Sequence, residues 1–184
     1  MAKTGNIRAM LSEGEGRMAA GRAAEVAALI LASPAKGSWL IECLWDKDPG
    51  VANRAAQALE QVTREGLAHL DRRLTAIVDS WKNSLLGLLG EATERKLRWH
   101  LALIVPRLSL TGPECRRAAE TLESWLEDRS SIIGTCALQG LYDLTRRDPS
   151  LSAHVLDLLR IHSRTGTPAM RARGRLLLRD LESS

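Results

Sequence analysis

Cys136 and His100 are the two residues of this chain whose types could form a nucleophile and its base. Each stands three positions after the apolar residue that opens a helical pattern, Leu97 before the histidine and Ile133 before the cysteine. If the two helices are neighbours, the imidazole could accept the thiol proton and activate the sulfur as a nucleophile. Two stacked surface residues would have the same spacing, and we favour that simpler interpretation.

Equivalent positions of successive helical patterns hold mostly basic residues, with Trp99 beside them between Arg98 and His100. A tryptophan flanked by cations can anchor a protein partner or stack on a nucleic-acid base. The alternative is that Trp99 packs between neighbouring repeats. The candidate partner-binding residues are Arg54, Arg98, Trp99, His100, Arg171 and Arg173.

Arginine is concentrated between Arg160 and Arg179, where the nearest acidic residues that follow are Asp180 and Glu182. Such a stretch could bind phosphates or an acidic protein. It could equally be the polar face of a capping helix, because cations are favourable near a helix C-terminus. We favour the capping interpretation.

The spacings of common catalytic and metal sites are absent: the chain has no HExxH, no paired CxxC and no GxSxG. Gly16 and Gly21 have the glycine spacing of a phosphate loop, but the lysine that should follow is missing and no strand precedes them. The four histidines have no metal-ligand partner one helical turn away. We therefore expect no catalytic centre, no metal and no cofactor.

Four copies of a loop-and-helix pattern must position these residues. Their first apolar residues recur at intervals of about 36 to 46 residues, a period typical of stacked two-helix repeats; these residues are Val51, Leu97, Ile133 and Met170. In the clearest copy, one helical face is apolar throughout; it consists of Val51, Ala55, Ala58, Leu59 and Val62.

Partner helices are expected between the copies, and an Ala-rich helix is expected over Arg17–Ala32. Leu67–Leu89 has the pattern of one long helix, Pro113 suits a first turn, and Pro106 should bend or end its helix. No segment has the alternation of a strand. We predict an all-α fold, an α-α superhelix of about four to five hairpins. It should form a single domain over residues 1–184, with a flexible start of about 15 residues.

The segment Asp46–Leu59 resembles the HEAT repeat, an armadillo-like α-solenoid. Asp46, Val51 and Arg54 match the turn Asp, the Val and the Arg of its inner helix, and the copies at Asp128 and Pro168 match in part. The resemblance implies that inner helices line a concave face, and also that Arg54 and Arg173 could support the stack by bonding turn residues. It does not imply an activity, because this class includes scaffolds, adaptors, enzyme regulators and a few enzymes.

Two HEAT-like families suggest more specific functions. One removes alkylated bases from DNA with Trp and Asp residues in a groove. Trp81, Trp99 and Asp79 are residues of these types, but they do not align with its motif. The other comprises the chromophore lyases of light-harvesting systems and their helper subunits.

Composition indicates a reducing compartment and no membrane. Three cysteines occur singly among 184 residues, no signal peptide opens the chain, and the longest apolar stretch, Val26–Ala32, is too short to span a bilayer. The sequence therefore favours a cytoplasmic, non-catalytic scaffold that binds a protein or peptide. A nucleic-acid-binding protein comes second, because a net charge of +4 is modest, and a chromophore-lyase-like helper is third.

Overall fold

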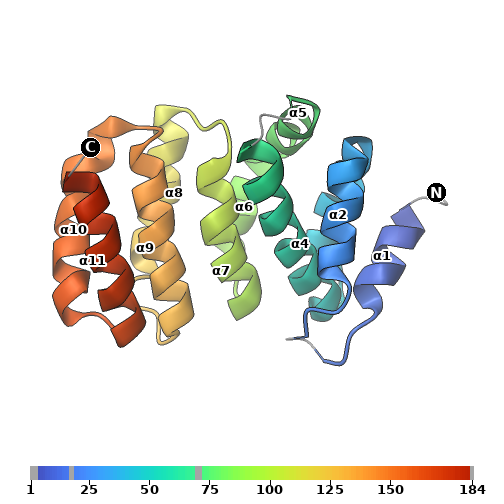
Figure 1. Ribbon diagram of the computed structural model, residues 1–184, viewed down its shortest axis with the longest axis horizontal. Coiled ribbons are helices and arrows are strands. Elements are labelled where there is room, and N and C mark those ends of the chain that lie inside the picture. Colours follow the sequence, from blue (N-terminus) through green and yellow to red (C-terminus); the bar gives the residue numbers. More distant parts are fainter. Residues whose placement is uncertain (1–3, 17–18, 69–71, 183–184) are drawn as a thin grey trace. The chain divides into compact units, whose positions relative to one another are not determined.

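The computed structural model describes residues 4–16, 19–68 and 72–182 (Figure 1). All regular structure in these residues is helical, so the all-α prediction is confirmed. No helix among them is long and apolar enough to cross a membrane. The chain forms two compact units, the N-terminal unit Met1–Leu85 and the C-terminal unit Leu86–Ser184. That residues 1–184 act as a single domain stays a prediction.

The N-terminal unit is built around one long helix, α4 (Pro49–Ala68). The expected apolar face of α4 is confirmed, since all five of its residues are buried: Val51, Ala55, Ala58, Leu59 and Val62. Small alanines in the middle of that face allow neighbouring helices to pack closely. The helices that contact α4 include α1 (Thr4–Ser12), α2 (Ala23–Ala32) and α3 (Gly37–Glu42).

Two predicted helices are shorter in the structure. The Ala-rich helix begins at Ala23 rather than at Arg17, which lies outside the described residues, because Gly21 has a φ of 50° that a right-handed helix cannot contain. The long Leu67–Leu89 helix is divided into the end of α4, α5 (Arg72–Ser80) and α6 (Lys82–Glu91). The turn between α5 and α6 lies at Trp81, whose indole Nε1 donates to Ser38 Oγ at 3.5 Å.

The C-terminal unit has two layers of helices. Its helices are α7 (Arg95–Ile104), α8 (Gly112–Ser124), α9 (Ser131–Thr145), α10 (Ser152–Thr165) and α11 (Pro168–Glu182). Helix α9 packs between α7 and α11 in one layer, and α8 and α10 form the other (Figure 1). Leu101, Leu138 and Leu159 are among the side chains buried between the layers.

The helix ends predicted from two prolines of the C-terminal unit agree with the structure. Helix α7 ends at Ile104, and the chain continues as a 3₁₀ turn that contains Pro106, as expected for a proline at that point. Pro113 lies in the first turn of α8, where Thr111 and Glu114 cap each other's backbone N–H groups. These signals determine where the helices begin and end.

Two glycines bring helices of the C-terminal unit unusually close together. A Cβ atom at Gly140 on α9 would overlap the carbonyl oxygen of Ala102 on α7. A Cβ at Gly174 on α11 would lie 3.3 Å from Ser163 on α10. The spacing at Gly140 has no room for a side chain, and a Cβ at Gly174 would make a tight contact, so both glycines favour the close approach of α7 and α11 to their neighbours.

Candidate functional site

Arg54, the first candidate residue, is buried in the N-terminal unit with only 2% of its surface exposed. Its Nε donates to the carbonyl oxygen of Leu11, and one terminal nitrogen donates to the carbonyl oxygen of Gly16 at 3.1 Å. The side chain therefore holds the chain after α1 against α4, which agrees with the stack-supporting alternative. In this arrangement the guanidinium is not accessible to a partner.

The turn before α4 is organised by two aspartates. Asp46 accepts from the Asp48 backbone N–H at 2.9 Å and pairs with Arg8 at 2.6 Å. Asp48 accepts from the Gly50 backbone N–H at 2.8 Å, at the start of the helix. Asp46, the turn aspartate of the HEAT-like pattern, thus holds the turn and pairs with α1, whereas Asp48 acts in the manner of a helix N-cap.

Arg98, on α7, makes its main contacts within the C-terminal unit. Its guanidinium donates to Asp128 at 2.6 Å and lies 4.4 Å from the ring centre of Trp125. Burial alone would raise the pKa of Asp128, but the Ser130 backbone N–H and Arg98 outweigh it, and the pKa is lowered. Both side chains of the ion pair are about four-fifths buried, with 18% and 21% exposed. This cluster ties α7 to the loop that precedes α9.

The next two candidates, Trp99 and His100, differ in exposure. Trp99 is half-buried, and its ring lies edge-on to that of His100 with the centres 5.4 Å apart. His100 is 8% exposed, and burial, assisted by the charge of Lys96, lowers its pKa to about 3. Neither ring nitrogen of His100 has a hydrogen-bond partner in the described structure. A Cys136–His100 catalytic pair is therefore not formed, and His100 is not the surface residue that its spacing suggested.

Arg171 and Arg173 lie on α11 and point to different surroundings. Arg171 is half-buried and donates to the carbonyl oxygen of Gly166 at 2.9 Å, which holds the turn before its helix. Arg173 is exposed, and its charge acts on Asp143 of α9. Burial raises the pKa of Asp143 despite the amide of Gln139, which donates to it at 2.8 Å, and the nearby arginines.

Within the C-terminal unit, the structure does not gather the candidate residues into one cluster. Arg54 belongs to the N-terminal unit, and the residues on α7 and α11 are divided by α9. Arg54 and His100 are buried, Arg98, Trp99 and Arg171 are half-buried, and Arg173 is exposed. Their partner-binding roles stay predictions, with Arg173 in the most accessible position.

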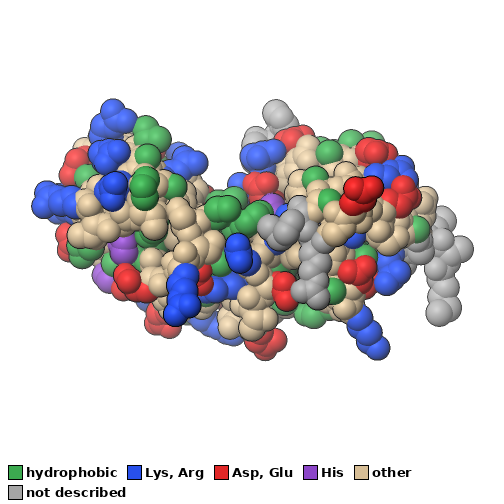
Figure 2. Space-filling model, turned by 90° about the horizontal axis from the view of Figure 1, so that it is seen from below, with side chains coloured by type: hydrophobic (Ala, Val, Ile, Leu, Met, Phe, Trp, Pro, Cys, Tyr) green, Lys and Arg blue, Asp and Glu red, His purple; other side chains and the backbone are tan. Residues whose placement is uncertain are grey.

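The arginine-rich C-terminal stretch forms a basic surface on α10 and α11. Figure 2 shows Lys and Arg side chains gathered at the end of the molecule that these helices occupy. Arg164, Arg173, Arg175 and Arg179 are exposed there. Leu176 lies among the arginines of α11 and has 51% of its surface exposed. Arginine beside an exposed apolar side chain is the composition that protein interfaces favour.

Metal, thiol and phosphate-loop chemistry can each be compared with the described residues. No three His, Cys, Asp or Glu side chains there are placed to hold a metal ion. Burial raises the pKa of the Cys43 thiol to about 11 and also raises that of Cys115, so both thiols are protonated at neutral pH. Gly16 follows α1 rather than a strand, so this glycine spacing lacks the context of a phosphate loop.

Two concave features were not anticipated from the sequence. One, of about 300 Å³, lies beside the loops before α9 and α11 and includes Asp128, His162 and Met170. The other, of about 560 Å³, lies in the N-terminal unit and includes Lys36 and Trp39. No motif singled out these residues, because they converge from separate helices and turns.

Comparison with known proteins gives the fold class. No protein-family model matches the sequence, and no curated protein matches it. The structure is similar to a phycocyanin lyase chain in the complex of CpcE and CpcF from Nostoc sp. PCC7120. The TM-score is 0.70 at 18% identity, over 96% of this chain and 98% of that one.

It is also similar to an engineered protein solved by the Northeast Structural Genomics Consortium. There the TM-score is 0.67 at 16% identity, over 99% of this chain and 80% of that one. At such identities the likeness concerns the fold alone. It confirms the expected class of helical solenoid.

Proposed function

We propose that this chain is a chromophore-lyase-like helper subunit, which acts by binding another protein. The observation that carries the proposal is the likeness to a phycocyanin lyase chain over nearly the full length of both molecules. That chain was solved as one of two subunits in a complex. The same likeness favours the lyase-like function over a scaffold with no connection to chromophores, which was our first expectation.

The surface of α11 supports a role in protein binding. Arg173, Arg175 and Arg179 surround Leu176, which is half-exposed. An apolar side chain within a group of arginines can become a binding hot spot when a partner covers it. The chain carries a net charge of +4, so an acidic partner surface would be attracted to this helix. We therefore place the partner on α11.

The binding step can be tested with two matched variants. Leu176→Asp combined with Arg175→Glu should weaken capture of the native partner by at least about tenfold, the effect of losing one hot-spot contact. Arg117→Glu, an exposed charge reversal on α8, should leave capture unchanged. Circular dichroism should show equal helicity in all three proteins. Undiminished capture by the α11 variant would contradict this placement of the partner.

The lyase-like step needs a chromophore readout. The captured partner should be purified from cells with and without this chain, and its covalently attached pigment measured by absorbance after denaturation. We expect the attached pigment to fall when the chain is absent. A partner that carries no pigment in either strain would overturn the lyase-like function and return the scaffold interpretation to first place.

A further inference from the structure

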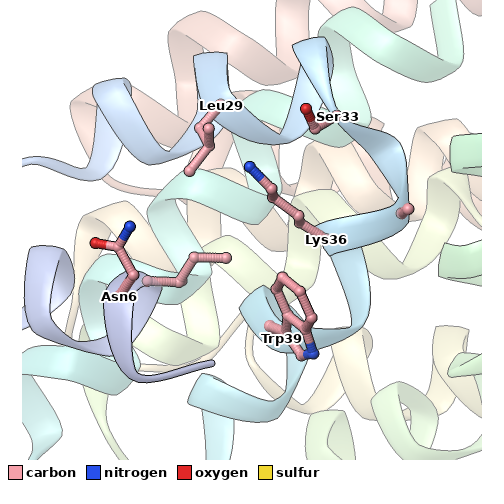
Figure 3. Close-up of a pocket in the computed structure, with 7 residues that line it drawn as sticks. Asn6, Leu29, Ser33, Lys36 and Trp39 are labelled. Carbon is pink, nitrogen blue, oxygen red and sulfur yellow. The ribbon is translucent and has the colours of Figure 1, made fainter. Parts of the chain in front are cut away.

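A pocket of about 560 Å³ opens in the N-terminal unit between α1, the end of α2 and the start of α3. Its size lies within the range of pockets that hold small organic ligands. Figure 3 shows side chains from all three segments directed toward the same space. The pocket is distant in sequence from α11 and does not depend on the partner surface proposed there.

The walls of this pocket are mainly apolar. Ile7 is buried at its base with 1% exposure, and Leu29 and Ala35 line it from α2 and the turn after it. Trp39 of α3 is half-buried and forms one side (Figure 3). An indole ring provides a large flat surface that favours stacking with another ring. The shape therefore suits a flat, apolar ligand.

A single positive charge reaches into this apolar space. The amino group of Lys36 extends between Leu29 and Trp39 (Figure 3). No carboxylate among the described residues forms an ion pair with Lys36. Asn6 and Ser33 add hydrogen-bonding groups at the margin of the pocket. A ligand with one anionic group could satisfy the ammonium while its apolar part covers the walls.

We propose that this pocket binds an aromatic carboxylate, with its carboxylate on Lys36 and its ring system against Trp39. One lysine without an accompanying arginine favours a single-charged group over a phosphate, which usually recruits several donors. The apolar walls exclude small, fully hydrated anions such as acetate, because they offer no compensation for lost water.

Naphthalene-2-carboxylate is a suitable probe, and NMR of the full chain is a suitable assay. The five tryptophans should give five indole N–H signals, and a Trp39→Phe variant identifies that of Trp39. We expect the probe to shift the Trp39 signal in a saturable way. The signals of Trp45 and Trp81, which pair elsewhere with ring centres 6.1 Å apart, should not move with the same affinity.

Whether the Lys36 ammonium recognises the carboxylate of the probe is tested first on the unmodified protein and then by substitution. Neutral naphthalene-2-carboxamide should bind about tenfold more weakly than the carboxylate, since a charge-assisted hydrogen bond is lost. Lys36→Gln should remove this preference, whereas Lys47→Gln, at an exposed lysine of the same unit, should keep it. Ala35→Phe, which fills the pocket, should abolish the Trp39 shift.

Three results would overturn the assignment. The first is an unchanged Trp39 signal at about 1 mM probe, which corresponds to negligible affinity. The second is equal binding of the amide and the carboxylate to the unmodified protein. The third is equal binding of decanoate, which would assign the pocket to aliphatic acids instead of aromatic ones.

Discussion

Replacing Arg54 with methionine should destabilise the N-terminal unit by about 2–4 kcal/mol. The substitution removes a guanidinium that donates to the carbonyl oxygens of Leu11 and Gly16. Hydrogen bonds from charged groups contribute about 1.5–3 kcal/mol each, but removing a buried cation also relieves its desolvation cost. Methionine keeps most of the apolar stem, so the cavity that remains is small. The expected loss therefore comes mainly from two carbonyl groups left without their donor.

Urea unfolding, followed by circular dichroism and tryptophan fluorescence, measures this loss. Arg54→Lys keeps the charge but cannot reach both carbonyls, and we expect it to lose about half as much stability. Arg173→Met is the matched control, because Arg173 is exposed, and its effect should stay within about 0.5 kcal/mol. The reasoning would be refuted if Arg54→Met cost less than about 1 kcal/mol and abolished partner capture. That outcome would restore Arg54 to the binding surface.

Four further predictions concern the C-terminal unit and α6. His100→Phe should reduce acid sensitivity. The pKa of His100 in the folded protein, about 3, lies below its usual value of 6.5. The contribution of neutral His100 to the free energy of unfolding is therefore fully present above pH 6.5 and is lost as the pH falls toward 3, because the unfolded chain takes up the proton first. Unfolding at pH 7 and pH 5 should show a loss of about 2 kcal/mol in the natural protein and much less in the variant. Arg98→Met should cost about 2 kcal/mol in urea unfolding, because the Asp128 side chain, about four-fifths buried, is left without its cation. A loss below about 0.5 kcal/mol would show that the Arg98 contacts behave as surface contacts. Gly140→Ala should lower the free energy of unfolding by about 1–3 kcal/mol, because the new Cβ would overlap the Ala102 carbonyl oxygen. Gly87→Ala, where α6 offers open space, should raise the free energy of unfolding by about 0.5–1 kcal/mol.

The sequence predicted the helices well wherever local signals were strong. The apolar face of α4 and the helix boundaries at Pro106 and Pro113 all agree with the structure. The helix predicted from Arg17 failed because a pattern of helix-forming residues does not reveal that Gly21 adopts a left-handed conformation. The division of Leu67–Leu89 was missed; one of its breaks lies at Trp81, whose indole contacts Ser38, a residue far away in the sequence.

The candidate site was predicted less well, and the reason is specific. Repeat position identified residues on equivalent parts of each helix, but it did not reveal how each side chain is used. Arg54 turns inward to backbone carbonyls, Arg98 pairs with Asp128, and Arg173 remains exposed, although all three are arginines among the same six candidates. Lys36 and Trp39 belong to no motif, and their pocket exists only because α1 packs beside the start of α3.

The sequence by itself determined the class of this protein: helices, their apolar faces and their repeat, because these depend on periodicity within each segment. Tertiary structure alone decided which basic side chains are buried, which are paired and which remain accessible. The physical reason is that a guanidinium or an imidazole takes its role from partners on other segments. Arg54 has a structural role because it donates to the carbonyl oxygens of Leu11 and Gly16. Arg173 lies on the exposed side of α11 and is accessible to a partner.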